Sequence, residues 1–191
     1  MYYKNNINLL KKNYNQIYKD IIKIIPDKNT YEVIKTKTNQ STLQITKENK
    51  SIYLHSKYNL HREAKNIAEE NYDLNVQNYI IFGLGFGYHI EELMDIAPNV
   101  NFYILETNKE IFRLAIDNVD LSNIIENDRI RLYVTDEMIK INEILSEVLT
   151  KENIKIVLHN PSFGIMPENL KELKHLLEEF RMKEKSVEKF I

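Results

Sequence analysis

The sequence lacks cysteine and tryptophan altogether, and only four of its 191 residues are glycine and four are proline. The absence of cysteine excludes disulfide bonds, thiolate metal sites and cysteine nucleophiles. Every apolar run is far shorter than the roughly 20 residues that span a bilayer. The first residues also lack the unbroken apolar core of a signal peptide. We therefore predict a cytoplasmic protein without a membrane partner.

The charge composition argues against nucleic acid as a partner. The formal net charge is −2, and the Lys and Arg residues are scattered along the chain. Long-range attraction to nucleic acid needs a basic face, which this distribution does not predict. Hydrophobic residues make up 43% and charged residues 28% of the sequence, which is typical of a globular protein with one sizeable core.

Residues 1–75 are predicted to form an N-terminal cap. One apolar stripe with alternating spacings of four and three predicts a single helix that ends at Pro26. Three short β-like runs, 31–36, 42–46 and 51–55, are separated by polar turns and predict an antiparallel meander. A short helical pattern follows near residues 60–68. The apolar stripe of the first helix consists of Leu10, Tyr14, Ile17, Ile21 and Ile24.

Residues 76–191 have a different rhythm. Nearly continuous apolar runs at 79–82, 100–105, 130–134 and 154–158 are typical of strands buried on both faces of a parallel sheet. Helical patterns lie between these runs, as in βαβ units. We expect an α/β fold, a Rossmann-like three-layer domain with at least four parallel strands. A last helical pattern, from residue 167, is expected to lead towards a further domain downstream.

Three of the four glycines, Gly83, Gly85 and Gly87, fall within five residues. They follow a predicted buried strand and precede a helix that begins near Tyr88. Glycine allows positive φ and leaves no Cβ in the way of a ligand, while a helix start offers unpaired N–H groups. This context favours a nucleotide-binding loop. Tyr88 occupies the position where the dinucleotide fingerprint has glycine, which argues against a dinucleotide cofactor.

The G-x-G-x-G pattern is closer to the loop of S-adenosylmethionine-dependent methyltransferases. Glu106, at the end of the second strand, would then bind ribose hydroxyls, and Asp136, after the third strand, would reach the adenine. Ile81 stands where such enzymes usually have an acid. The alternative is that the glycines serve packing alone, that Glu106 is a solvated strand-end acid and that Asp136 caps a helix. The predicted ligand-binding residues are Gly83, Gly85, Gly87, Glu106 and Asp136.

The histidines give weaker signals. The segment His159–Gly164 follows the fourth strand and would face the same crevice; a strand ended by proline with a polar turn is the favoured interpretation. His89 begins a helix but has no second histidine four residues later. His55 and His61 flank a polar turn and are predicted at the surface. We therefore predict no metal site, and we assign no catalytic residue.

Two stretches together carry a family resemblance. Residues 51–58, SIYLHSKY, and residues 79–93, YIIFGLGFGYHIEEL, with the strand that ends in Glu106, resemble the N-terminal domain of motility accessory factor proteins, the bacterial flagellin glycosyltransferases. In that family, such a domain precedes a sialyltransferase-like domain, and the whole proteins are thought to attach nonulosonic acids from CMP-sugars to flagellin.

The resemblance implies an accessory module that is not catalytic by itself. It makes a nucleotide or nucleotide-sugar, such as a CMP-sugar, a candidate ligand, and it makes flagellin the protein substrate of the whole enzyme. The competing hypothesis is a methyltransferase-like enzyme with S-adenosylmethionine as cofactor.

Overall fold

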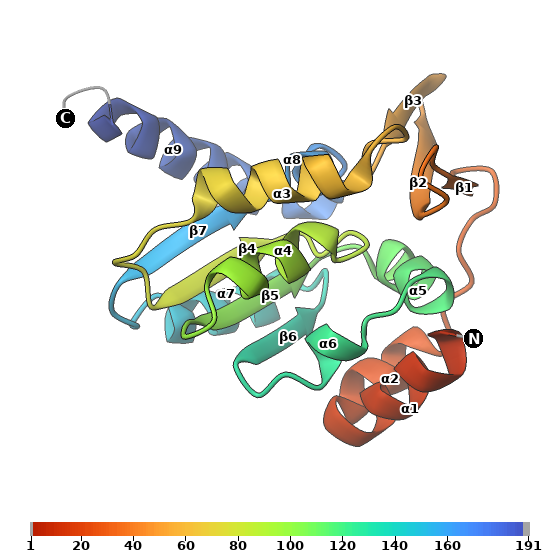
Figure 1. The fold of residues 1–191 in the computed structure, drawn as a ribbon, viewed down its shortest axis with the longest axis horizontal. Helices are drawn as coiled ribbons and strands as arrows, with labels where there is room; N and C mark the ends of the chain where they lie inside the picture. Colours follow the sequence, from red (N-terminus) through yellow and green to blue (C-terminus); the bar gives the residue numbers. More distant parts are fainter. Residues whose placement is uncertain (1, 189–191) are drawn as a thin grey trace.

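The computed structural model describes residues 2–188, in which a parallel sheet carries helices on both faces and a small antiparallel sheet lies beside it (Figure 1). The elements in chain order are α1 (Tyr2–Asn13), α2 (Asn15–Ile21), β1 (Tyr31–Lys35), β2 (Ser41–Lys47), β3 (Lys50–Tyr53), α3 (Leu60–Asn71), β4 (Asn78–Phe82), α4 (Tyr88–Ile96), β5 (Asn101–Glu106), α5 (Lys109–Asn118), α6 (Ser122–Ile125), β6 (Ile130–Val134), α7 (Met138–Val148), β7 (Ile154–Leu158), α8 (Asn160–Gly164), η1 (Glu168–Leu170) and α9 (Lys171–Glu188).

The parallel sheet has the strand order β6-β5-β4-β7. All three pairings are parallel, with Ile81 of β4 level with Ile104 of β5 and Val157 of β7. The chain first steps to one side of β4 and then crosses to the other side, so the carboxyl ends of β4 and β7 flank a topological switch point. Open α/β sheets bind ligands at such a point. The predicted Rossmann-like fold with four parallel strands is confirmed.

The two faces of this sheet belong to two separate cores. Alternate residues of β4 point to opposite faces, as in any strand. Tyr79 and Ile81 join the larger core with residues of α4, α5 and α6, whereas Ile80 and Phe82 join a second core with residues of α7 and α9. This arrangement is the predicted three-layer architecture.

The antiparallel meander is also confirmed. Strands β1, β2 and β3 pair in sequence order, and a two-residue turn joins β2 to β3. Both turn residues, Glu48 and Asn49, have positive φ values of 51° and 60°. Positive φ at both central positions is the backbone of the turn that matches the twist of a hairpin.

The prediction of one N-terminal helix is wrong, because the chain folds into two. Helix α1 ends at Asn13 and α2 begins at Asn15, and Tyr14 between them has φ −138° and ψ 58°. The Tyr14 hydroxyl donates to the carbonyl of Ile130, 3.2 Å away. This contact joins the residue between the two helices to the first residue of β6.

Helix α1 is joined to the parallel-sheet part by a buried asparagine. Asn6 is fully buried; its amide group donates to the carbonyls of Ile116 and Val119, and its carbonyl accepts from the N–H of Leu121. The larger core likewise includes residues from both sides of position 75. The division into 1–75 and 76–191 stays a prediction, and the described core is continuous across it.

The segment after β7 differs from the prediction. Residues Asn160–Gly164 form the short helix α8 instead of a polar turn, because Pro161 fits the first turn of a helix, where its missing N–H costs nothing. Ser162 and Phe163 are buried. None of the helices within residues 2–188 combines the length and the hydropathy of a transmembrane span.

Candidate functional site

All five backbone amides of the glycine loop, residues 83–87, are bonded within the chain. Gly83 donates to the carbonyl of Leu105, and Gly87 donates to the carbonyl of Leu84, each at 2.9 Å. Leu84 and Gly85 donate to one carboxylate oxygen of Glu106 at 2.9 and 3.1 Å. Phe86 donates to Nε2 of His55 at 3.0 Å. The N–H groups expected to face a ligand are therefore already occupied.

Glu106 supplies the anion of this loop. Its side chain is 1% exposed, and its second carboxylate oxygen accepts from the N–H of Asn108 at 2.9 Å. Burial raises the pKa of Glu106, while the N–H groups of Asn108, Gly85 and Leu84 oppose that rise by bonding to the charged form. A carboxylate of the protein thus takes the place that a ligand phosphate takes in a nucleotide loop.

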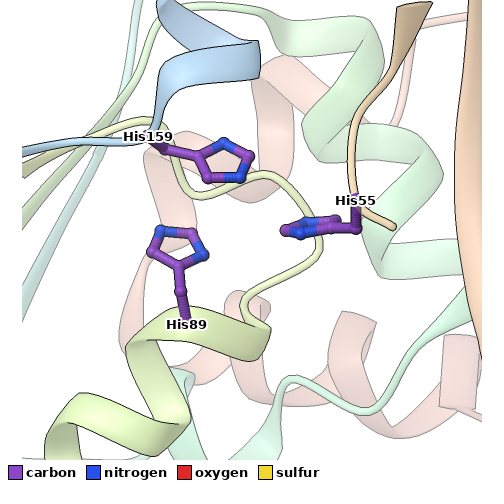
Figure 2. Close-up of side chains that lie close together, drawn as sticks. All are labelled: His55, His89 and His159. Carbon is purple, nitrogen blue, oxygen red and sulfur yellow. The ribbon is translucent and has the colours of Figure 1, made fainter. Parts of the chain in front are cut away.

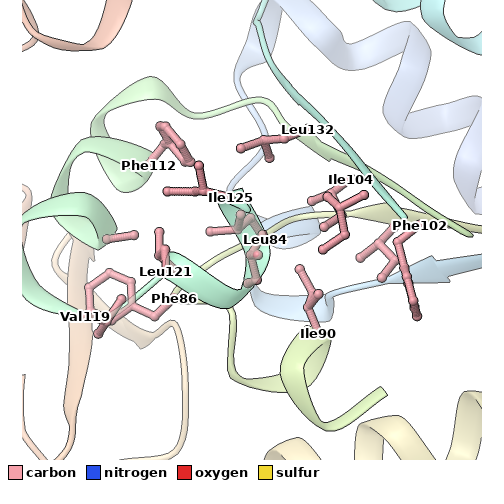
Figure 3. Packing of buried hydrophobic residues seen from close by; sticks show 14 of the residues in the cluster. Leu84, Phe86, Ile90, Phe102, Ile104, Phe112, Val119, Leu121, Ile125 and Leu132 are labelled. Carbon is pink, nitrogen blue, oxygen red and sulfur yellow. The ribbon is translucent and has the colours of Figure 1, made fainter. Parts of the chain in front are cut away.

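The two side chains between the glycines anchor the loop in the larger core. Leu84 and Phe86 are 0% and 2% exposed, and they pack near Val119 and Leu121 (Figure 3). Burial of a leucine or phenylalanine side chain stabilises a protein by about 1.5–3 kcal/mol. Displacement of the loop would expose both side chains to solvent. The loop conformation, in which all five amides are bonded within the chain, is therefore stabilised by hydrophobic packing as well as by hydrogen bonds.

The glycines are required by close packing over the loop. A Cβ on Gly83, which has φ +93°, would lie 2.4 Å from Cβ of Ser162 and 3.0 Å from Cβ of His159. A Cβ on Gly85 would lie 2.8 Å from Nε2 of His55 and 3.2 Å from Cε1 of His159. Imidazole rings and a serine therefore approach the bare backbone, as a ligand would in a nucleotide-binding protein.

Three histidines meet at this switch point (Figure 2). His55 follows β3, His89 lies in the first turn of α4, and His159 directly follows β7. They are 2%, 1% and 1% exposed. The prediction of a surface position is thus wrong for His55, whereas the His61 side chain is 69% exposed. The rings of His89 and His159 are stacked with centroids 4.4 Å apart.

Each of the three rings is oriented by a different polar group. Nδ1 of His55 lies 3.2 Å from a carboxylate oxygen of Glu63, Nε2 of His89 lies 3.1 Å from the carbonyl of Gly83, and Nδ1 of His159 lies 2.7 Å from the hydroxyl of Ser162. Nδ1 of His89 and Nε2 of His159 are buried and have no hydrogen-bond partner among the described residues.

Burial favours the neutral form of His89 and His159. Desolvation lowers the pKa of His89 to about 3, with a smaller contribution from His55. Desolvation and the neighbouring His89 lower the pKa of His159 well below its ordinary value. These two rings therefore retain a lone pair at neutral pH, and neutral imidazole is the form that coordinates metals.

The predicted ligand-binding residues do not all meet. Gly85 donates to the carboxylate of Glu106, whereas Gly83 and Gly87 donate to backbone carbonyls. The Asp136 side chain is 42% exposed and forms an ion pair with Lys109 at 2.8 Å. Ligand binding at these positions stays a prediction. Such binding would require the Glu106 carboxylate to leave the loop amides first, because a ligand anion could not otherwise reach them.

Sequence reasoning missed the histidine cluster although each histidine lies in a stretch that it had singled out. His55 and His89 belong to the two stretches that carry the family resemblance, and His159 begins the segment after the fourth strand. The carboxyl ends of β4 and β7 had to be adjacent for His89 and His159 to meet. That adjacency follows from the strand order, which no single motif reveals.

A pocket of about 340 Å³ lies beside the loop, at the contact with the meander. Phe86, Tyr88 and Glu91 reach it from the loop and α4, and Asp120 reaches it from the segment before α6. The Tyr88 hydroxyl donates to the carbonyl of Ser41 at 2.7 Å, and burial raises the pKa of Tyr88 to about 12. The pocket is predominantly polar, and it is lined by both acids and the Lys35 side chain.

Glu91 predicts a pH dependence of stability. Burial and, to a smaller extent, Asp120 raise the pKa of Glu91 from 4.5 to about 7 in the folded protein. Between these values the folded state retains a proton that the unfolded state has released, so Glu91 lowers stability progressively as the pH rises from about 4.5 to 7. We expect Glu91→Gln to stabilise the protein by about 2 kcal/mol at pH 8 and to have little effect at pH 4.5.

Urea unfolding at several pH values measures this difference. The exposed Glu143 of α7 serves as the control, since Glu143→Gln should leave stability unchanged at every pH. A pH-independent effect of Glu91→Gln would contradict the prediction.

Comparison with known proteins gives one family. The family described as "Glycosyltransferase Maf N-terminal domain" matches residues 28–163. None of the curated proteins compared with the chain matches it. Among solved structures, the crystal structure of MNMC2 from Aquifex aeolicus has 15% sequence identity and a TM-score of 0.34; the alignment covers 65% of this chain and 48% of that chain. Because the family match includes well over half of the sequence, together with the glycine loop and all three histidines, the chain belongs to the Maf glycosyltransferase N-terminal domain family.

Proposed function

We propose that the chain is the accessory domain of a motility-associated flagellin glycosyltransferase, and that nonulosonic acid transfer is performed by other residues of the whole protein. One observation carries the accessory role: the loop amides that would hold a nucleotide are occupied by Glu106 and His55. A domain closed in this way fits the role of positioning its neighbours better than that of holding a reacting sugar nucleotide.

Flagellin is the protein substrate in this proposal. Deletion of the gene should remove the sugar mass from intact flagellin, as measured by mass spectrometry, and reintroduction of the whole gene should restore it. Flagellin of unchanged mass in the deletion strain would exclude this substrate.

The closed loop predicts the response to nucleotides. CMP, CMP-sialic acid and S-adenosylhomocysteine, each at millimolar concentration, should produce no saturable heat in calorimetry and no shift in melting temperature, because a ligand stabilises a protein only if it binds the folded state. Heat with CMP or CMP-sialic acid would instead support nucleotide or nucleotide-sugar binding by the domain.

Nucleotide binding is the second candidate because the strand, loop and helix have the right order at a switch point. Saturable binding of S-adenosylhomocysteine would support the methyltransferase-like alternative. That alternative is disfavoured because Ile81 is fully buried and because both oxygens of Glu106 accept backbone N–H groups, so neither is directed to ribose hydroxyls.

A further inference from the structure

The histidine cluster has the polar surroundings of a metal site. Metal-binding histidines usually donate the N–H of their remote ring nitrogen to a carboxylate or a backbone carbonyl, which fixes the tautomer and aims the other nitrogen at the metal. Here, the carboxylate of Glu63 accepts from His55, and the carbonyl of Gly83 accepts from His89. The hydroxyl of Ser162, which can donate or accept, lies 2.7 Å from Nδ1 of His159 and accepts from it in the tautomer that leaves Nε2 free for a metal.

The nitrogens left by these contacts face a common space. The Gly83 carbonyl can only accept, so Nε2 of His89 carries the hydrogen and Nδ1 keeps its lone pair. With Nδ1–H of His159 donating to Ser162, Nε2 keeps its lone pair. These are the two buried nitrogens without a partner among the described residues. Figure 2 shows the three rings turned towards the space between them.

We propose that His55, His89 and His159 bind one divalent transition-metal ion, and that zinc is the ion best suited to them. One ring nitrogen from each residue lies within 4.8 Å of those of the other two. A tetrahedral zinc site with Zn–N bonds of about 2.0–2.1 Å holds its nitrogens about 3.3 Å apart, so the nitrogens need to approach one another by at most about 1.5 Å. Three imidazoles without thiolate or carboxylate ligands favour zinc and its transition-metal neighbours over magnesium or calcium.

Binding has a structural consequence at one backbone group. Nε2 of His55 accepts from the N–H of Phe86, 3.0 Å away, and the metal would take that lone pair. Phe86 N–H then loses its partner, while the bonds of Leu84 and Gly85 to Glu106 are kept. Zinc would therefore hold the meander side of the site, through His55, against α4 and the end of β7.

Zinc content and melting temperature test the site on the full chain without an affinity tag. After treatment with EDTA and dialysis, addition of zinc chloride should leave one zinc per chain after gel filtration. A hundredfold excess over Kd should raise the melting temperature by about 5 °C or more, whereas magnesium chloride should not change it. Cobalt(II) should give the intense visible absorption of a tetrahedral site. Failure to retain zinc, with an unchanged melting temperature, would overturn the proposal.

Variants locate the ion. His89→Asn and His159→Gln should each abolish retention of zinc, whereas the exposed pair His61→Ala and His175→Ala should bind as the wild type does. Retention by the first two variants would overturn the assignment. If they do not fold, X-ray absorption of the wild type at the zinc edge decides: a shell of imidazole nitrogens near 2.0 Å supports the site, and a shell of oxygen alone overturns it. Faster exchange of the Phe86 amide with zinc than without would further support the loss of its bond to His55.

Discussion

Substitution of Gly83 by alanine should destabilise the protein by about 3–4 kcal/mol. The new Cβ would lie 2.4 Å from Cβ of Ser162, and the backbone would keep φ +93°, which L-residues rarely adopt. Overpacking costs about 1–3 kcal/mol, and the left-handed backbone adds about 1–2 kcal/mol. The midpoint of urea unfolding in the presence of EDTA measures the change without any contribution from bound metal.

Gly164 provides the matched control. A Cβ at this position meets no atom within 4 Å, and its φ is not positive. Gly164→Ala should therefore leave stability unchanged or raise it by up to about 1 kcal/mol. Equal stability of the two variants would contradict the close packing of Ser162 and His159 over the loop.

Replacement of Glu106 by glutamine should cost about 1–3 kcal/mol. The two carboxylate oxygens accept three backbone N–H groups, from Leu84, Gly85 and Asn108. In either orientation, the glutamine amide places an NH₂ group against at least one of these donors, and an unsatisfied buried polar group costs about 1–3 kcal/mol. Thermal and urea unfolding should both record the loss.

Glu126, which is exposed at the end of α6, is the control for this change. Glu126→Gln should alter stability by less than about 0.5 kcal/mol. If Glu106→Gln were equally harmless, the carboxylate would not be the group that holds the loop closed.

The sequence predicted the architecture because hydrophobic periodicity records burial. The run 79–82 is apolar throughout, and the strand β4 that contains it is buried at every position. The stripe through Tyr14 did not reveal the break between α1 and α2. Tyr14 is apolar enough to continue the stripe, and its hydroxyl contact at the break is made with the distant Ile130, which no local pattern reveals. The helix α8 was missed because a five-residue segment gives no periodicity.

The candidate site was predicted only in outline. The clustered glycines did mark a position of close approach, but they could not tell whether a ligand or the chain's own side chains approach. His55 and His159 pack over Gly85 from segments that are distant in sequence. Glu106 is the last residue of the second parallel strand whether it binds a ligand or the loop. Only the fold shows that its carboxylate turns back to accept from the loop amides.

Amide hydrogen exchange, measured by NMR on the metal-free chain, tests the closed loop most directly. The amides of Leu84 and Gly85 should exchange as slowly as that of Ile81 in the central strand, because all three would open only with global unfolding. Exchange of the two loop amides as fast as that of Asn49 in the exposed hairpin turn would show an open loop and contradict the proposal that Glu106 keeps it shut.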